Sequence, residues 1–299
     1  MSGDRISPTA HYTGYVWARN GLSPEGFATL EGRLLFESLR GVNTLNSALG
    51  GDSLERYLLA RHRSIDRLLE AAIDGGAVSQ VVEVACGLSP RGWRFGSRYG
   101  DRLTYVEADL PGMADRKREA LRKLGSLSEH HRVEDVDALA ADGPGSLQDL
   151  AARLDHRRGT AIITEGLTGY LDGDGLRAMW GNFARVLGGF PAGRYISDLH
   201  LGAVQNAQIR AFRLLLSAFI RGSVHLHFEA AEEAVAALAQ AGFDAAEVRP
   251  ASELVPDGGQ GGAQLVHIIE ASTSRSTSRQ RSSATRRARG RIPRTRPSG

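Results

Sequence analysis

Short apolar runs alternate with stretches of helical periodicity from residue 80 to residue 269 of this chain. The segments expected to form strands are Gln80–Val84, Leu103–Glu107, His131–Val136, Thr160–Thr164, Arg194–Asp198, Ala245–Arg249 and Gln264–Ile269. Those expected to form helices are Arg91–Tyr99, Met113–Leu124, Ser146–Leu154, Gly173–Leu187 and Ala230–Ala241. Such alternation favours parallel strands joined by crossover helices on both faces. We therefore expect an α/β fold with a doubly wound, mostly parallel sheet of seven strands.

Two regions depart from this alternation. Residues 1–76 have a mostly helical pattern, which is strongly amphipathic over Leu54–Leu69. Residues 201–228 are longer than an ordinary crossover turn, and the apolar spacing over Ala207–Ile220 predicts an amphipathic helix. Ligands of such sheets bind outside the carboxyl ends of the strands. We expect an N-terminal helical cap (1–76) on an α/β domain (77–270) whose helical lid insertion near 201–228 either covers this crevice or only buries the sheet.

The C-terminal residues 271–299 form a basic segment. They contain nine arginines and no acidic residue. Because the whole chain carries a net charge of +3, residues 1–270 are mildly acidic, at −6. A segment of Ser, Thr, Arg and Pro buries too little apolar surface to fold, so we expect a disordered, solvated tail. Its alternative role is contact with nucleic acid or another partner by counterion release.

Composition excludes several classes of protein. The single cysteine, Cys86, cannot form an internal disulfide or a cysteine metal cluster. No apolar run approaches the roughly 20 residues that cross a bilayer, and the N-terminus lacks the pattern of a secretory signal. We expect a cytoplasmic protein without bound metal or membrane contact, acting on a small molecule. The oligomeric state is not predicted.

Acidic residues stand at the carboxyl ends of three expected strands. Glu83 precedes a small-residue turn containing Gly87, where exposed backbone N–H groups suit a nucleotide-like ligand. Glu107 and Asp109 close the second strand, where a carboxylate commonly accepts hydrogen bonds from ribose hydroxyls, and both remain candidates. Glu165 closes the fourth strand, where it would face the crevice and pair with a cationic part of the ligand. We therefore expect a nucleoside-containing ligand.

Three segments, VVEVACGLSPRGWRF, YVEADLP and IITEGLTGYL, resemble the leucine carboxyl methyltransferase family in this order. The opening ISPTAHYTGYVWARNGLS is similar to its bacterial branch, which includes a tetracenomycin polyketide carboxyl methyltransferase. The resemblance spans roughly residues 6–270 and leaves out the tail. It implies a Rossmann-like class I methyltransferase fold with S-adenosyl-L-methionine as the donor. The implied reaction is O-methylation of a carboxylate on a small, polyketide-like or other secondary metabolite.

The resemblance also implies which residues bind the methionine part of the donor. Glu83 and Gly87 fall on the segment around the methionine moiety, and Glu165 falls on the acid that contacts its amino end. Arg19 falls on an N-terminal arginine that binds the methionine carboxylate. Many relatives have a glycine where this chain has Ala85, which makes this turn a point of departure from the family.

For the nucleoside part, the resemblance places Glu107 or Asp109 at the ribose. Asp135, followed by Val136, falls near an acid–aliphatic pair at the adenine, with Asp137 as the alternative register. A nicotinamide-dependent reductase is disfavoured because the G-x-G-x-x-G fingerprint is missing.

The nature of the acceptor decides whether a catalytic base is needed. A carboxylate, with a pKa of about 4, is already ionised at neutral pH, so proximity, orientation and water exclusion suffice. A phenol or alcohol would need a base, for which Tyr170, His200 and His227 are candidates. Two further hypotheses are a protein C-terminal carboxylate as acceptor, and a binding or regulatory protein whose tail contacts nucleic acid or a partner.

Overall fold

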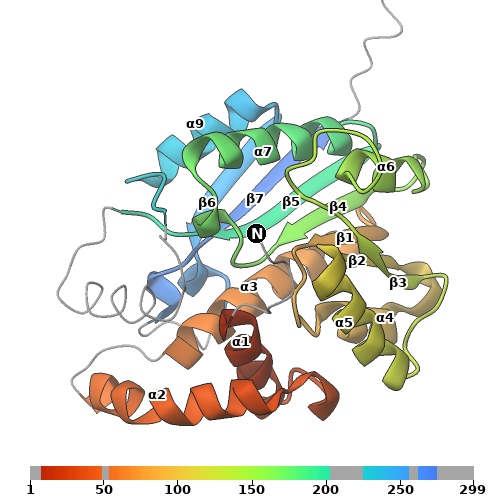
Figure 1. The fold of residues 1–299 in the computed structure, drawn as a ribbon. Helices are drawn as coiled ribbons and strands as arrows, with labels where there is room; N and C mark the ends of the chain where they lie inside the picture. The colour runs from red at the N-terminus through yellow and green to blue at the C-terminus, as the bar shows by residue number, and fades with distance from the viewer. Residues whose placement is uncertain (1–7, 49–53, 203–224, 256–261, 275–299) are drawn as a thin grey trace, which may run out of the picture.

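The computed structural model describes residues 8–48, 54–202, 225–255 and 262–274 (Figure 1). The expected lid helix at 207–220 lies outside these residues. Seven strands form one sheet in the order β3-β2-β1-β4-β5-β7-β6. Their bounds are β1 Gln80–Val84, β2 Thr104–Asp109, β3 His131–Asp135, β4 Thr160–Thr164, β5 Ala192–Leu199, β6 Ala245–Pro250 and β7 His267–Ser274. Neighbouring strands are parallel except β7, which is antiparallel to β5 and β6, so the predicted mostly parallel sheet is confirmed.

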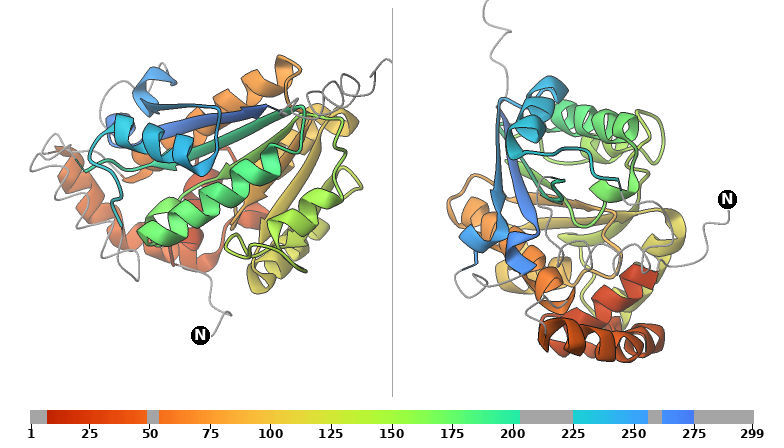
Figure 2. Two further views of the ribbon diagram at one scale, coloured as in Figure 1. Left: turned by 90° about the horizontal axis from the view of Figure 1, so that it is seen from above. Right: turned by 90° about the vertical axis from the view of Figure 1, so that its left-hand side faces the viewer.

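Helices cover both faces of the sheet, as a doubly wound fold requires (Figures 1 and 2). Helices α3 and α4 pack on one face, and α6, α7 and α9 on the other. Helices α1 and α2 lie beyond α3, on the side away from the sheet (Figure 1). The bounds are α1 Pro8–Arg19, α2 Leu30–Ala48, α3 Leu54–Asp74, α4 Arg91–Tyr99, α5 Pro111–Lys123, α6 Leu147–Ala152, α7 Gly173–Leu187 and α9 Ala231–Ala241.

Side chains of the central strands alternate between two buried clusters. Val81 of β1 belongs to a cluster with residues of α3, while the adjacent Val82 belongs to one with Trp180 of α7. This alternation follows from the two-residue repeat of a strand. The first cluster also contains Tyr12 of α1 and Phe36 of α2, so the N-terminal helices share one core with the sheet.

The last strand corrects the expected start of the tail. β7 continues to Ser274, so residues 271–274 belong to the sheet rather than to the disordered segment. β7 lies between two neighbours, and both edges of its backbone find hydrogen-bond partners there. Ala271 and Thr273 are buried, and Ser272 between them is half-buried, as the two-residue repeat of a strand requires. The Ser- and Thr-rich composition of this segment concealed that repeat. Residues 275–299 lie outside the described residues.

Candidate active site

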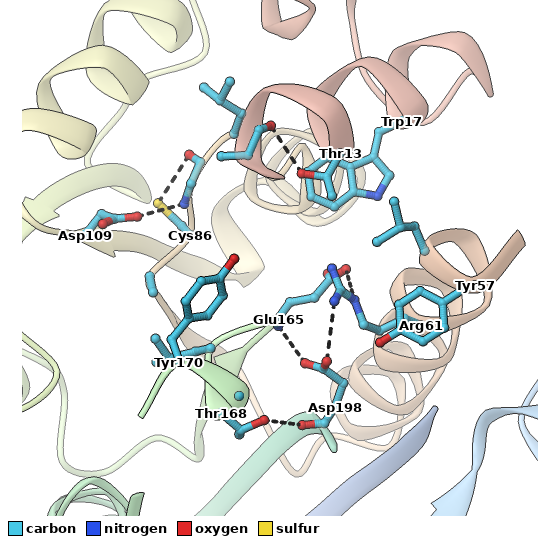
Figure 3. Close-up of a pocket in the computed structure, with 18 of the residues that line it drawn as sticks. Thr13, Trp17, Tyr57, Arg61, Cys86, Asp109, Glu165, Thr168, Tyr170 and Asp198 are labelled. Atoms are coloured by element: carbon cyan, nitrogen blue, oxygen red, sulfur yellow. Dashed lines mark hydrogen bonds and ion pairs between the residues drawn. The ribbon is translucent and has the colours of Figure 1, made fainter. Parts of the chain in front are cut away.

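A cavity of about 250 Å³ lies at the carboxyl ends of β1, β2, β4 and β5 (Figure 3). Its walls come from the turn 85–88, Asp109, the segment 165–170, Asp198 and His200, with α1 and α3 on the opposite side. This is the crevice position expected for a ligand of an open α/β sheet. In the part of the chain that the structure describes, no group of three His, Cys, Asp or Glu side chains could hold a metal ion. No helix there is long and apolar enough to cross a bilayer.

The turn after β1 carries a strained residue in the cavity wall. Ala85 has φ 54°, and among the described residues it is the one non-glycine residue with a positive φ. Gly87 has φ 52°, and a Cβ placed there would come no closer than 4.0 Å to Ala10. A left-handed conformation costs a non-glycine residue about 1–2 kcal/mol. The turn therefore holds Ala85, a residue of the cavity lining, in an unfavourable backbone conformation.

Asp109 ties the end of β2 to this turn. Its Oδ2 accepts a hydrogen bond from the Gly87 N–H at 2.8 Å, and its Oδ1 accepts one from the Leu110 N–H at 2.8 Å. Burial raises the pKa of Asp109, and the two N–H donors offset part of that rise. Of the two candidates for the ribose-binding acid, Asp109 is the one that lines the cavity.

Glu107 instead lies beneath the turn in a sealed ionic cluster. It pairs with the fully buried Lys117, and its Oε1 is 2.7 Å from His131 Nε2. Lys117 Nζ also donates to the Ser89 carbonyl at 2.5 Å and to the Gly87 carbonyl at 3.4 Å. Burial alone would raise the pKa of Glu107, but Lys117 and His131 lower it below its ordinary value. Glu107 thus supports the turn and makes no contact with the cavity.

A buried arginine stands at the end of the cavity near β4 and β5. Arg61 of α3 donates from Nε to Glu165 Oε1 at 3.0 Å and from Nη1 to Asp198 Oδ2 at 3.5 Å (Figure 3). Asp198 Oδ1 also accepts the Gly166 N–H at 2.6 Å, which fixes the chain after β4. The sequence reasoning missed Arg61. The sequence feature that could have identified it is its position on the apolar face of α3, four residues from both Tyr57 and Ile65, where an arginine is unexpected.

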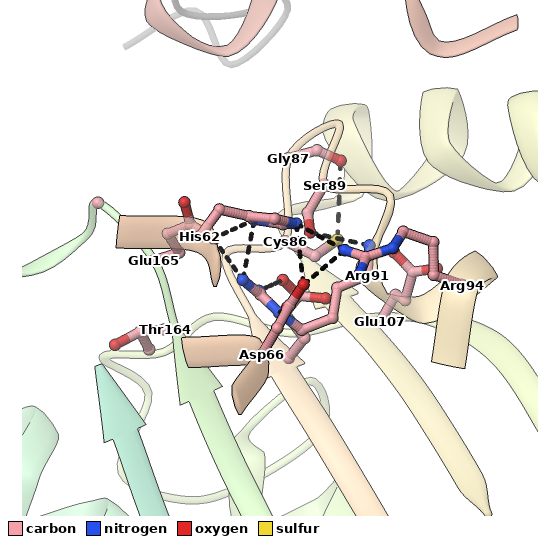
Figure 4. Close-up of polar contacts among 12 residues, drawn as sticks. His62, Asp66, Cys86, Gly87, Ser89, Arg91, Arg94, Glu107, Thr164 and Glu165 are labelled. Atoms are coloured by element: carbon pink, nitrogen blue, oxygen red, sulfur yellow. Dashed lines mark hydrogen bonds and ion pairs between the residues drawn. The ribbon is translucent and has the colours of Figure 1, made fainter. Parts of the chain in front are cut away.

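Behind Glu165 lies a network of buried charges (Figure 4). Glu165 Oε2 is 2.6 Å from Arg91 Nη2 and 2.8 Å from His62 Nδ1, and Arg91 Nε donates to Asp66 at 2.7 Å. Burial alone would raise the pKa of Glu165, but His62, Arg61 and Arg91 hold it well below its ordinary value. Glu165 is therefore an ionised carboxylate in a fixed orientation at the cavity.

Glu83 belongs to this network and does not line the cavity. Its carboxylate pairs with Arg91 and accepts a hydrogen bond from the Tyr105 hydroxyl at 2.7 Å. The strand repeat explains this position, because Glu83 points to the sheet face covered by α3 and α4 rather than along the strand. Its link to the cavity runs through Arg91, which also pairs with Glu165.

Three further predicted residues lie outside the cavity lining. Asp135 is half-exposed and pairs with Arg118 at 3.0 Å, and Val136 is buried in the core. Arg19 is the last residue of α1, where its half-exposed side chain pairs with Glu55 at 3.5 Å and lies over Phe36. The cavity contains a different arginine, Arg61.

Of the three candidate catalytic residues, Tyr170 and His200 line the cavity, whereas His227 lies outside its lining, with its Nε2 3.1 Å from the Thr168 carbonyl oxygen. Tyr170 ends the short helix Thr168–Tyr170 and is 43% exposed. His200 follows β5 and contacts the Tyr57 hydroxyl through Nε2, with the two rings stacked at a centroid distance of 5.6 Å. The structure thus brings Gly87, Asp109, Glu165, Tyr170 and His200 to one cavity.

The fold and the site together define the class of protein. A sheet with one antiparallel strand, β7, and a cavity flanked by acids after β2 and β4 is the arrangement of a class I methyltransferase. The chain matches the family model described as "Leucine carboxyl methyltransferase" over residues 25–184, more than half of its length. It belongs to the leucine carboxyl methyltransferase family, which confirms the resemblance seen in its sequence.

Relatives that match in sequence agree with this assignment. A "Putative S-adenosyl-L-methionine-dependent methyltransferase" of Mycobacterium tuberculosis (strain ATCC 25177 / H37Ra) is 33% identical over 136 residues, 46% of this chain and 42% of that protein. A protein with the same description from Mycolicibacterium gilvum (strain PYR-GCK) is 34% identical over 128 residues, 43% of this chain and 40% of that protein. The matched region thus covers less than half of these relatives. Together with the family, they make S-adenosyl-L-methionine the cofactor, as predicted.

Two solved structures show the same fold over most of the chain. "A putative methyltransferase" from Thermobifida fusca YX has a TM-score of 0.62 at 14% identity, covering 89% of this chain and 98% of that one. A DUF574 family protein from Streptomyces avermitilis MA-4680 has a TM-score of 0.61 at 12% identity, covering 89% and 97%. At these identities the likeness establishes the fold alone.

Proposed function

We propose that this protein is an S-adenosyl-L-methionine-dependent O-methyltransferase that methylates a carboxylate of a small, largely apolar metabolite. The observation that carries this proposal is one cavity that joins a ribose-type acid, Asp109, to an ionised Glu165–Arg61 pair across a small-residue turn. A protein C-terminal carboxylate stays the alternative acceptor. The cytoplasmic location and the bacterial branch within the family stay predictions.

The residues around the cavity match the chemistry of the donor from end to end. Asp109 would accept hydrogen bonds from the ribose hydroxyls, and the small turn 85–88 admits close approach of a ligand. Glu165 would pair with the amino group of the methionine part, and Arg61 with its carboxylate. Arg61 is already held by Glu165 and Asp198, so its side chain is oriented before the ligand arrives.

The apolar part of the cavity would receive the acceptor. Trp17, Leu54, Tyr57 and Leu58 line it, from α1 and α3. When bound, the donor would supply a methyl group on a sulfonium for transfer to an acceptor oxygen. The surrounding side chains contribute by aligning that oxygen and excluding water, which is worth several kcal/mol when the alignment is good.

Calorimetry with the demethylated product, S-adenosylhomocysteine, tests the proposal directly. We expect saturable binding of one molecule per chain and loss of affinity in Asp109→Asn, with Asp135→Asn as the matched control outside the cavity. Absence of binding by the wild-type chain would refute the proposal. A binding or regulatory role instead predicts S-adenosylhomocysteine binding without turnover of any acid in a panel of aromatic and aliphatic carboxylates. Contact of the basic tail with nucleic acid stays a separate prediction, tested by deleting residues 275–299.

A further inference from the structure

The turn after β1 depends on the orientation of one peptide group. The Ser89 N–H donates to the Cys86 carbonyl at 2.9 Å, which closes a four-residue turn with Gly87 and Leu88 at its centre (Figure 4). Gly87 has φ 52°, whereas Leu88 is not among the described residues with a positive φ. This combination is typical of a type II′ turn. Turning over the peptide between Gly87 and Leu88 would give a type I′ turn, which needs a positive φ at Leu88 as well.

Lys117 contacts this turn through two of its carbonyl groups. The lysine side chain is fully buried and does not line the cavity, and its Nζ donates to the Ser89 carbonyl at 2.5 Å and to the Gly87 carbonyl at 3.4 Å. It also pairs with Glu107. Burial alone would lower the pKa of Lys117, but Glu107 raises it above its ordinary value, so the side chain stays charged. The three N–H groups of one ammonium thus meet three acceptors.

Lysine is rare in this chain. Of the 37 basic residues only Lys117 and Lys123 are lysines, and Lys123 is exposed. A guanidinium is planar, and its donors lie in one rigid fork, whereas an ammonium is compact and its donors rotate about a single nitrogen. A site with a carboxylate and two carbonyls around one buried nitrogen therefore suits lysine better than arginine.

The direction of the Leu88 N–H follows from these contacts. The peptide between Gly87 and Leu88 is trans, so its N–H points opposite to the Gly87 carbonyl. That carbonyl faces Lys117, outside the cavity lining, whereas Leu88 itself lines the cavity and is 5% exposed. Among the described residues, the Leu88 N–H meets no acceptor. An N–H buried without an acceptor costs about 1–3 kcal/mol, which a ligand oxygen at that place would recover.

We propose that Lys117 is a positioning residue for the donor: by holding the Gly87 carbonyl it directs the Leu88 N–H into the cavity, where that N–H donates to a ribose oxygen. The ribose is the partner because the preceding N–H, that of Gly87, is bound to Asp109, the acid assigned to the ribose. A ribose hydroxyl can donate to Asp109 and accept from Leu88 at the same time. This inference rests on the proposed function, since it concerns how the same cavity binds the donor.

The contact of the Leu88 N–H can be observed in the full wild-type chain by nuclear magnetic resonance. Labelling with carbonyl-carbon-13 glycine and nitrogen-15 leucine selects the amide signals of leucines that follow a glycine, and the Leu88 signal is the one lost in Leu88→Ile. We expect this proton signal to move downfield when the protein is saturated with S-adenosylhomocysteine, because the N–H gains an acceptor. A Leu88 signal that stays in place at saturation overturns the inference.

A double variant tests the part that Lys117 plays. Lys117→Met combined with Glu107→Gln removes the ammonium without leaving a buried carboxylate unpaired. We expect it to weaken S-adenosylhomocysteine binding about fivefold in calorimetry, the worth of one hydrogen bond, and to reduce the downfield shift of the Leu88 signal. Lys123→Met, in the same helix α5, is the matched control and should change neither. An unchanged affinity or an unchanged shift in the folded double variant refutes the role of Lys117.

A shorter ligand locates the contact along the donor. The compound 5′-methylthioadenosine contains the nucleoside but lacks the amino-acid part. We expect the double variant to lose the same factor of affinity for it as for S-adenosylhomocysteine, and a loss confined to S-adenosylhomocysteine contradicts the contact with the ribose. Failure of the wild type to bind S-adenosylhomocysteine would refute the proposed function itself, whereas normal binding with an unmoved Leu88 signal refutes this inference alone.

Discussion

Replacing Ala85 by glycine should stabilise the protein. Ala85 is held at φ 54°, a conformation that costs a residue with a Cβ about 1–2 kcal/mol. Glycine removes this cost but adds about 0.4–1 kcal/mol of conformational entropy to the unfolded chain. The balance predicts that Ala85→Gly raises the free energy of unfolding by about 0.5–1 kcal/mol.

The neighbouring Gly87 provides a matched control. Its φ of 52° is almost the same, and a Cβ there would find 4.0 Å of clearance from Ala10. Gly87→Ala should therefore lower the free energy of unfolding by a similar amount, from backbone strain rather than from a clash.

Urea unfolding monitored by tryptophan fluorescence measures both variants. With a urea dependence near 3 kcal/mol per M, Ala85→Gly should raise the midpoint by about 0.2–0.3 M, and Gly87→Ala should lower it. Because Ala85 lines the cavity and glycine is smaller, the glycine variant should also bind S-adenosylhomocysteine at least as tightly as the wild type. Shifts of the same sign in the two variants would refute the strain argument.

The remaining predictions concern the charged residues of the cavity. Asp109→Asn should weaken S-adenosylhomocysteine binding about tenfold in calorimetry. Because burial raises the pKa of Asp109, wild-type affinity should begin to decline, as the pH is lowered, at a higher pH than an aspartate of ordinary pKa would produce. Arg61→Lys keeps the positive charge but loses the planar guanidinium, and should lower the affinity for S-adenosylhomocysteine about tenfold. Asp198→Glu, measured alongside, reports on the Arg61–Asp198 ion pair. The lowered pKa of Glu165 stabilises the fold above the ordinary value of 4.5, and that contribution is lost as the pH falls towards the folded value. Acid titration of stability should thus be less steep in Glu165→Gln, by up to about 1.4 kcal/mol per pH unit, and an unchanged slope would contradict the assignment.

The central strands β1, β2 and β4 were predictable because they are buried on both faces. Gln80–Val84 and Thr160–Thr164 are short segments with an apolar centre, and both match the structure residue for residue. β7 was misplaced because its second half, residues 271–274, has the composition of the tail that follows it. Local composition could not reveal that this half pairs with two strands distant in sequence.

The site was predictable where a residue stands at the very end of a strand. Asp109 and Glu165 reach the cavity because the chain turns directly after them. Glu83 and Glu107 come earlier in their strands, so the pleat directs them to the face under α3 and α4. Arg61 could not be placed from strand ends at all, because it comes from a helix that packs across the sheet.

The attachment of α3 to the sheet has a consequence for how the chain can be divided. Glu165 follows β4, yet two of the three basic side chains that contact it, Arg61 and His62, come from α3. A truncation that began at residue 77 would leave this carboxylate buried with Arg91 alone. Removing the partner of a buried charge destabilises a fold by about 3–5 kcal/mol, which is a large share of the free energy of unfolding of an ordinary domain. The helices before residue 77 and the sheet after it should therefore melt as one cooperative unit, and neither should survive expression by itself.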